Sequence, residues 1–371
     1  MSRLRVAIVA PSLDFLGGQA VQAGRLIDAW RDDPDVEAWL VPHNPVPPGF
    51  LSHARKVKYL RTIVTELTYI PLIFREIARA DVVHVFSAAY TSFLLAPLPA
   101  LLTAKLLRRP AILNYRSGQG PDHLKRSRLA RRVIAQTDCT IVPSAFLVDV
   151  FASFGLQARP VPNLLDLERF QYRRRTMPGP RILSVRNFEP LYDVACTLRA
   201  FQIVQQRRPD ASLTLVGGGS EDAALRALAR ELQLTQVNFA GRVKPDEMPP
   251  WYARHDIYVQ SPRIDNAPTS VLEAYASGLP VVSSDAGGVP AILTHGEHGL
   301  LAPVGDHQAL AAHVLRLLDE PEFAVRLADQ ARATCSRHAW PSVRSEWLRT
   351  YHGLVSSQAV AVGNSPALRE L

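Results

Sequence analysis

The chain has 371 residues, which is too long for one common domain and suits two domains of about 150 to 200 residues. Apolar residues make up 47% of it and charged residues 20%, which excludes a disordered chain and is typical of a globular protein. The net charge of +8 lies in residues 1–165, where 20 Lys and Arg face 12 Asp and Glu, whereas residues 166–371 hold 22 of each sign. This charge indicates either solvated helix faces or attraction to an anionic membrane or substrate.

The first half of the chain alternates short β-branched runs with helical patterns. The run at 5–12 predicts a strand rather than a signal peptide, and a helix follows at 20–31. Further strands are expected at 36–43, 81–87, 111–116 and 139–144. Two prolines and a lysine interrupt the apolar stretch 93–107, which argues against a membrane span. Three cysteines without a C-x-x-C pair favour a reducing, cytoplasmic setting and no zinc site.

The same rhythm restarts after a proline-rich interruption at 159–181. Strands are expected at 181–187, 212–219, 237–242, 256–262 and 279–285. We therefore predict two Rossmann-like, doubly wound α/β domains that face a cleft. Their expected ranges are 1–165 and 166–340, followed by a helix at 341–356 and a tail at 357–371.

Glycine turns and one cation follow several predicted strands, where doubly wound sheets bind ligands. Gly17 and Gly18 precede the first helix, and their pattern is not the dinucleotide fingerprint G-x-G-x-x-G. Gly217 begins another tight turn, and Arg186 follows the strand at 181–187. Simple strand-to-helix turns and a surface arginine remain the alternatives.

The stretch RIDNAPTSVLEA at 263–274 places Asp265 eight residues before Glu273. Ser270 and Glu273 fit a capping box, which would make them purely local. A ligand site is the other interpretation. In it, the backbone amides of Thr269, Ser270 and Val271 bind an oxyanion, while the two carboxylates accept hydrogen bonds from hydroxyls. Phosphates flanked by polyols describe a nucleotide sugar.

The motifs together resemble glycosyltransferase family 4. They are PSLDFLGGQ near the start, VPSAFL, VPNLLDLERF, LTLVGGGSED, FAGRV and LEAYASGLPVVSSDAGGVPAIL. The resemblance covers about residues 5 to 355. It implies a retaining enzyme of the GT-B architecture that uses a nucleotide sugar and needs neither a cofactor nor a metal.

The resemblance also implies roles for individual residues. Glu273 would hold the ribose hydroxyls, and Asp265 would lie near the donor sugar. Arg186 would neutralise the departing diphosphate, helped by the amides of Gly17 and Gly18 and of the helix near Ser270. The base would lie by Arg242 and Val243. The remaining residues expected to bind the donor are Gly217, Asn266, Thr269, Ser270 and Val271.

The chain departs from the family pattern at several positions. Asp265 replaces a glutamate, Leu191 replaces a lysine, and Ala291 replaces an acid. Because a lost electrostatic donor costs about 10²–10³ in rate, an active enzyme needs a substitute cation. Arg116 or Arg263 could bind phosphate in that role.

The expected reaction is transfer of a sugar from UDP- or GDP-sugar to an acceptor hydroxyl. The acceptor would be a glycan or a lipid-linked precursor of a surface polysaccharide or glycolipid. We expect a cytoplasmic protein, with peripheral contact at the inner face of the membrane and no nucleic-acid partner. Two alternatives stay open: an epimerase of the same architecture, and a non-catalytic relative that binds nucleotide sugars. A nicotinamide oxidoreductase is disfavoured because no fingerprint turn follows the first strand.

Overall fold

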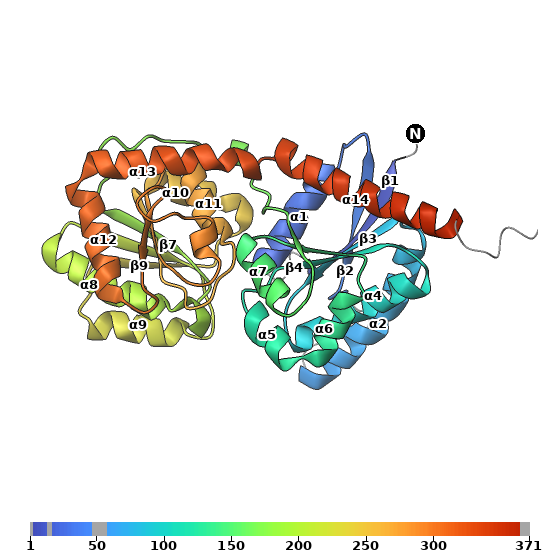
Figure 1. The fold of residues 1–371 in the computed structure, drawn as a ribbon. Coiled ribbons are helices and arrows are strands. Elements are labelled where there is room, and N and C mark those ends of the chain that lie inside the picture. The colour runs from blue at the N-terminus through green and yellow to red at the C-terminus, as the bar shows by residue number, and fades with distance from the viewer. Residues whose placement is uncertain (1–2, 13–16, 47–57, 364–371) are drawn as a thin grey trace, which may run out of the picture. The chain divides into compact units, whose positions relative to one another are not determined.

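A computed structural model describes residues 3–12, 17–46 and 58–363 and divides the chain into two compact units (Figure 1). Unit 1 comprises Met1–Pro143, Leu147–Leu164 and Trp340–Leu371, and unit 2 comprises Ser144–Phe146 and Leu165–Ala339. The expected boundary after residue 165 lies one residue from the division between Leu164 and Leu165. The assignment of Ser144–Phe146 to unit 2 was not expected.

Unit 1 is built on a parallel sheet in the order β2-β1-β3-β4-β5-β6. Its strands are β1 (Leu4–Ala10), β2 (Val36–Pro42), β3 (Val82–Ser87), β4 (Ala111–Tyr115), β5 (Cys139–Val142) and β6 (Arg159–Pro160). Its helices are α1 (Gly18–Trp30), α2 (Lys58–Ala78), α3 (Thr91–Leu95), α4 (Pro97–Leu106), α5 (Gly120–Arg126), α6 (Arg128–Ala135), α7 (Ala145–Ser153) and α14 (Trp340–Gly363). The strand order reverses between β1 and β3.

The C-terminal helix α14 completes the core of unit 1. Trp347 and Tyr351 pack with Trp30 and His84, and the His84 and Trp347 rings lie 4.4 Å apart. The helix was expected to end at residue 356 with a tail from 357, and this was wrong, because α14 continues to Gly363. Residues 357–362 contain neither glycine nor proline, so nothing in them ends a helix before Gly363. The rest of the expected tail, 364–371, lies outside the described residues.

Unit 2 contains a second parallel sheet, in the order β12-β11-β10-β7-β8-β9. Its strands are β7 (Arg181–Val185), β8 (Ser212–Val216), β9 (Val237–Gly241), β10 (Ile257–Gln260), β11 (Val281–Ser284) and β12 (Leu300–Ala302). Its helices are α8 (Val194–Arg207), α9 (Asp222–Glu231), α10 (Pro249–Arg254), α11 (Thr269–Ala276), α12 (His307–Asp319) and α13 (Pro321–Ala333). The order reverses between β7 and β10, which makes the carboxyl ends of these two strands the natural ligand position.

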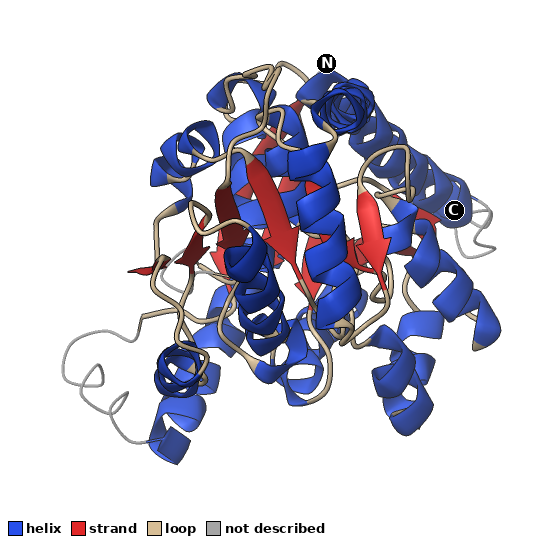
Figure 2. Cartoon of the chain, turned by 90° about the vertical axis from the view of Figure 1, so that its left-hand side faces the viewer, coloured by secondary structure: helices blue, strands red, loops and turns tan. Residues whose placement is uncertain are grey.

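Helices cover both faces of the sheets, whose strands are mostly buried (Figure 2). One core of unit 2 packs α8 and α12 on the sheet, and another packs α10, α11 and α13. The predicted class of two doubly wound parallel α/β domains is confirmed. The short strands β6 and β12 were missed, because two or three residues give no readable alternation.

Candidate functional site

Two polar side chains flank the point in unit 2 where the strand order reverses. Arg186 follows β7, and Gln260 is the last residue of β10. Nη2 of Arg186 donates hydrogen bonds to the side-chain oxygens of both Gln260 and Asp265. β7 and β10 are parallel neighbours, so their carboxyl ends bring these groups together.

Arg186 and Asp265 form a mostly buried ion pair. Nη2 of Arg186 lies 2.5 Å from Oδ2 of Asp265, and the two side chains are 10% and 14% exposed. The guanidinium also lies over the ring of Tyr192, 5.1 Å from its centroid. Burial opposes the charge on Arg186, but the nearby carboxylate of Asp265 favours it and raises the pKa of the guanidinium. Arg186 therefore stays charged at the strand ends, and Asp265 holds its guanidinium in a fixed position.

Glycines allow the backbone to close tightly around this pair. A Cβ on Gly217 would lie 1.8 Å from the carbonyl oxygen of Arg186, and φ of Gly217 is +155°. Likewise, a Cβ on Gly287 would lie 2.3 Å from the carbonyl oxygen of Asp265, and Gly288 donates to that oxygen at 3.1 Å. Any larger residue at Gly217 or Gly287 would displace Arg186 or Asp265.

Glu273 is held by a buried tyrosine. The hydroxyl of Tyr252 donates to Oε2 of Glu273 at 2.8 Å, and Glu273 is 7% exposed. Burial, with Glu273 alongside, raises the pKa of Tyr252 well above its ordinary value, so the hydroxyl stays a donor. The Tyr252 ring stacks 6.1 Å from that of Tyr258, whose hydroxyl donates to Gln260 at 3.2 Å. A continuous set of contacts thus joins Glu273 to Arg186.

The first turn of α11 differs from the capping box considered above. Pro268 occupies the N-cap position, and no side chain caps the helix. Ser270 lies inside the first turn, so it cannot act as the cap, and the capping-box prediction was wrong. The amide of Val271 donates to the carbonyl of Pro268 at 3.2 Å. This amide was expected to be free for an oxyanion, and that expectation was wrong. Thr269 and Ser270 lie at the start of the helix, as predicted.

Asn266 follows Asp265 directly and is 3% exposed. Its backbone amide donates to the Asp265 carboxylate at 2.8 Å, and its side-chain oxygen accepts from the hydroxyl of Ser144. Its Nδ2 and the Nε of Arg186 are both buried, and neither has a partner among the described residues. Buried donors without an acceptor are rare and often mark a functional site.

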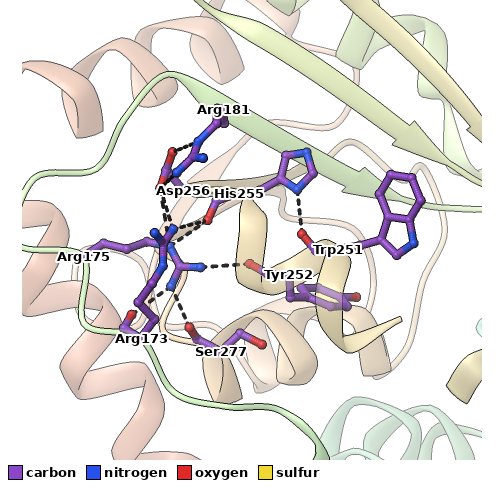
Figure 3. Close-up of polar contacts among 8 residues, drawn as sticks. All are labelled: Arg173, Arg175, Arg181, Trp251, Tyr252, His255, Asp256 and Ser277. Atoms are coloured by element: carbon purple, nitrogen blue, oxygen red, sulfur yellow. Dashed lines mark hydrogen bonds and ion pairs between the residues drawn. The ribbon is translucent and has the colours of Figure 1, made fainter. Parts of the chain in front are cut away.

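A buried arginine supports the far ends of the helices that carry Tyr252 and Glu273 (Figure 3). Arg175 donates to the backbone oxygens of Tyr252 at 2.8 Å, His255 at 2.7 Å and Ser277 at 2.6 Å. Its side chain is 2% exposed. Tyr252 lies in α10, and Ser277 is the C-cap residue of α11. Arg175 thus fixes α10 against α11.

The remaining predicted residues of unit 2 lie around this centre. Arg242 is exposed beside Gly218, whose carbonyl oxygen lies 3.4 Å from its Nη2, and Val243 packs against the apolar core. Arg263 pairs with Asp193 at 2.8 Å. The carbonyl of Leu191 accepts from the amide of Arg263 at 2.9 Å, so this candidate substitute cation is adjacent to the position of the missing lysine.

Gly17, Gly18 and Arg116 belong to unit 1. Gly17 is the N-cap of α1, and a Cβ on Gly18 would meet no atom within 4 Å. Arg116 follows β4, donates to Asn163 and Asn114, and lies over the Phe86 ring at 5.5 Å. Burial lowers the pKa of Arg116 to about 10, which leaves it charged at neutral pH. Their part in donor binding stays a prediction.

Two family models match successive parts of the chain. Residues 6–169 match "Glycosyltransferase Family 4", and residues 168–334 match "Glycosyl transferases group 1". The chain belongs to the family-4-type glycosyltransferases. The family resemblance predicted from the motifs is therefore confirmed.

Relatives of this family-4-type glycosyltransferase align with most of the chain. It is 27% identical to the sulfoquinovosyl transferase SQD2 of Arabidopsis thaliana, over 91% of this chain and 71% of the relative. It is 28% identical to the GDP-mannose-dependent alpha-(1-6)-phosphatidylinositol monomannoside mannosyltransferase of Mycobacterium tuberculosis, over 74% of each.

Solved structures share the fold. Anabaena Alr3699/HepE, in complex with UDP and glucose, superposes with a TM-score of 0.75 at 17% identity, over 95% of this chain and 100% of that one. Sucrose-phosphate synthase from Thermosynechococcus elongatus gives a TM-score of 0.75 at 20% identity, over 96% and 100%. These matches confirm the predicted GT-B fold class.

Sequence reasoning missed Gln260, Tyr252, Tyr258 and Arg175. Gln260 had a readable signal, because it is a polar residue at the end of a predicted strand. Tyr252 and Tyr258 are aromatic residues in apolar segments and gave the pattern of ordinary core. Arg175 stands in a run of three arginines, where a solvated surface is the usual interpretation.

Proposed function

We propose that this glycosyltransferase moves a sugar from UDP- or GDP-sugar to an acceptor hydroxyl with retention of anomeric configuration. The observation that carries the proposal is the Arg186–Asp265 pair, linked through Gln260, Tyr258 and Tyr252 to Glu273 at the strand ends. It combines a fixed cation with two carboxylates, as a diphosphate next to two sets of sugar hydroxyls requires.

In this proposal Glu273 accepts hydrogen bonds from the ribose hydroxyls, and Tyr252 orients its carboxylate. Arg186 stabilises the negative charge that builds on the leaving diphosphate, aided by the amides at the start of α11. Asp265 holds the guanidinium in place and faces the donor sugar. The amides of Gly17 and Gly18, the base position at Arg242–Val243, and the donor contacts of Gly217, Asn266, Thr269 and Ser270 are part of the same proposal.

Leu191 stands where the family usually has a lysine, so the diphosphate lacks one cation. We assign this role to Arg263. Its side chain is 61% exposed, and its backbone amide donates a hydrogen bond to the carbonyl of Leu191. Arg116 is the second candidate. A metal ion is not needed in this scheme, since arginine and helix amides supply the positive charge.

The acceptor proposed is a glycan or a lipid-linked precursor, in surface polysaccharide or glycolipid synthesis at the cytoplasmic face of the membrane. The curated relatives support this class, because their names include a sulfoquinovosyl transferase and a phosphatidylinositol mannoside mannosyltransferase. The excess of basic residues in 1–165 also fits an anionic partner.

The first test is thermal unfolding of the purified protein with UDP, GDP, ADP and their sugars. A nucleotide at 100 times its dissociation constant should stabilise the protein by about 2.7 kcal/mol. Glu273→Ala should abolish that shift. No shift with any nucleotide would favour the non-catalytic relative.

Transfer itself is tested by product analysis with the nucleotide sugar that binds. Arg186→Ala should lower kcat by about 10²–10³. Arg316→Ala is the matched control, because Arg316 forms an exposed ion pair with Glu320 on α12. Near-normal turnover of Arg186→Ala would remove its proposed role. Conversion of the donor without an acceptor would identify an epimerase, and an inverted product would exclude retention.

A further inference from the structure

Exposed apolar side chains of unit 1 concentrate in one layer of helices. In the described part of the chain, 15 large apolar side chains are exposed, and ten of them belong to α2, α3, α4 and α6. These ten, the apolar face, are Leu60, Ile63, Leu67, Ile70, Phe74, Leu94, Leu95, Leu102, Leu106 and Leu129. Exposed apolar side chains that gather on one layer of helices are a mark of an interaction site.

The five members on α2 form a straight stripe. They stand three, four, three and four residues apart, which places them on one side of the helix. Leu67 is 70% exposed and Ile63 is 57% exposed. The adjoining side of α2 packs into unit 1 through Tyr69, Ile73 and Ile77, each 0% exposed. The apolar surface of the helix is thus wider than the part that unit 1 covers.

Hydrogen bonds hold these helices in one layer. The hydroxyl of Tyr69 in α2 donates to the carbonyl of Ala96, between α3 and α4, at 2.9 Å. Lys105 of α4 donates to Gln136, which follows α6, at 3.0 Å. Figure 1 shows α2, α4 and α6 on the same side of the sheet.

The same layer is rich in positive charge. Helices α2, α3, α4 and α6 together contain seven Lys and Arg and two Glu, an excess of five basic residues. Exposed basic residues stand beside the apolar face, among them Arg75, Lys105, Arg108, Arg128 and Arg132. Apolar side chains bordered by exposed basic ones are the pattern of a helix that lies in a membrane interface.

We propose that α2, together with α3, α4 and α6, docks unit 1 on a bilayer that contains anionic lipids. The apolar face enters the boundary between headgroups and acyl chains, and the basic residues contact the anionic headgroups. Throughout the described residues no helix is both long and apolar enough to cross a bilayer. A second copy of the chain fits this face less well, because its excess of basic residues would then meet the same excess.

This inference rests on the proposed function in one respect, since it gives a lipid-linked acceptor a place to be presented. Its test is separate from catalysis. The full chain is sedimented with vesicles of phosphatidylcholine, with and without phosphatidylglycerol. Binding should be at least about tenfold stronger with the anionic lipid and should weaken in high salt.

The double variant Ile63→Glu, Leu67→Glu should lose at least about tenfold in vesicle binding and keep the melting temperature and nucleotide-induced shift of the parent. Val304→Glu is the matched control, because Val304 is an exposed apolar residue in unit 2, and it should bind vesicles as the parent does. Equal vesicle binding by the double variant and the parent would overturn the proposal. So would a dimer in sedimentation velocity that the double variant abolishes. Vesicle binding by a chain that binds no nucleotide would leave this proposal standing and remove the proposed function.

Discussion

The hydroxyl of Tyr252 donates a 2.8 Å hydrogen bond to Oε2 of Glu273, and this bond joins α10 to the middle of α11. Both side chains are buried, so the carboxylate has a fixed direction before any ligand arrives. A carboxylate oriented in this way can accept two neighbouring hydroxyls without losing side-chain entropy on binding. Glu273 is thus preorganised by a residue distant in the sequence.

Tyr252→Phe removes only this donor. A hydrogen bond to a charged group contributes about 1.5–3 kcal/mol, so we expect weaker nucleotide binding, by about tenfold or more, and lower stability. Isothermal titration with the nucleotide and urea unfolding measure the two effects. Tyr275→Phe is the matched control. Tyr275, in α11, is also buried, and its hydroxyl donates to the carbonyl oxygen of Ile292 at 3.4 Å. Equal nucleotide affinity in the two variants would contradict the orienting role.

Arg175→Met should destabilise unit 2 by about 3–5 kcal/mol, because it leaves buried backbone carbonyls without their donor. It should also raise the KM for the donor more than it lowers kcat, since the loss acts through Tyr252 and Glu273. Arg174→Met is the control. Arg174 is 59% exposed and pairs with Asp329, so its loss should cost less than about 1 kcal/mol. A similar loss in both variants would contradict the supporting role of Arg175.

Gly217→Ala should destabilise the protein by about 2–6 kcal/mol, from overpacking and backbone strain together. The new methyl would lie 1.8 Å from the carbonyl oxygen of Arg186, so Arg186 must move and transfer should fall as well. Gly353→Ala serves as the comparison. Gly353 lies in α14 with no atom near the added methyl, and the substitution should stabilise the helix by about 0.5–1 kcal/mol. Differential scanning calorimetry should show a lower melting temperature for Gly217→Ala and a higher one for Gly353→Ala than for the parent.

The stability of unit 1 should depend on pH through His84. This buried ring accepts from Asn114 and lies 2.9 Å from the Tyr351 hydroxyl, and burial lowers its pKa to about 3. Because the unfolded ring has a pKa near 6.5, the unfolded state binds more protons between about pH 6.5 and 3. Stability is therefore complete above about pH 6.5 and falls by about 1.4 kcal/mol per pH unit below it.

Urea unfolding between pH 4.5 and 7.5 checks this slope. His84→Gln should be less stable at pH 7. Its free energy of unfolding should also fall less steeply as the pH is lowered, because about one proton fewer is bound on unfolding. Other histidines whose pKa burial lowers, among them half-buried His43 and buried His123, account for the rest of the pH dependence. An unchanged slope in His84→Gln would show that His84 does not titrate on unfolding.

The sequence predicted the strands near the site well, because each is a β-branched run followed by glycine or a polar turn. Arg186, Asp265 and Glu273 were predicted from their places after strands and in the motif. In the structure Arg186 bonds Asp265, and contacts through Tyr252, Tyr258 and Gln260 join Glu273 to Arg186. Tyr252 and Arg175 could not be found, since their contacts join residues 21 and 102 positions apart and depend on how α10 packs on α11. The capping box failed for a local reason, because Pro268 is the N-cap and the helix starts two residues earlier than it would with Ser270 as the cap.

Helix α14 comes from the end of the chain yet packs against β3 and α1 near its beginning, and the 175 residues of Leu165–Ala339 lie between them. At 5–20 residues per second, synthesis of that stretch takes roughly 10–35 seconds. During this time the aromatic side chains of α14 that cover Trp30 and His84 have not yet been synthesised. Unit 2, in contrast, can fold as soon as its last helix emerges. The nascent first unit is therefore the part of this protein that most needs a chaperone, and a ribosome that stops before α14 releases a chain whose N-terminal core is still open.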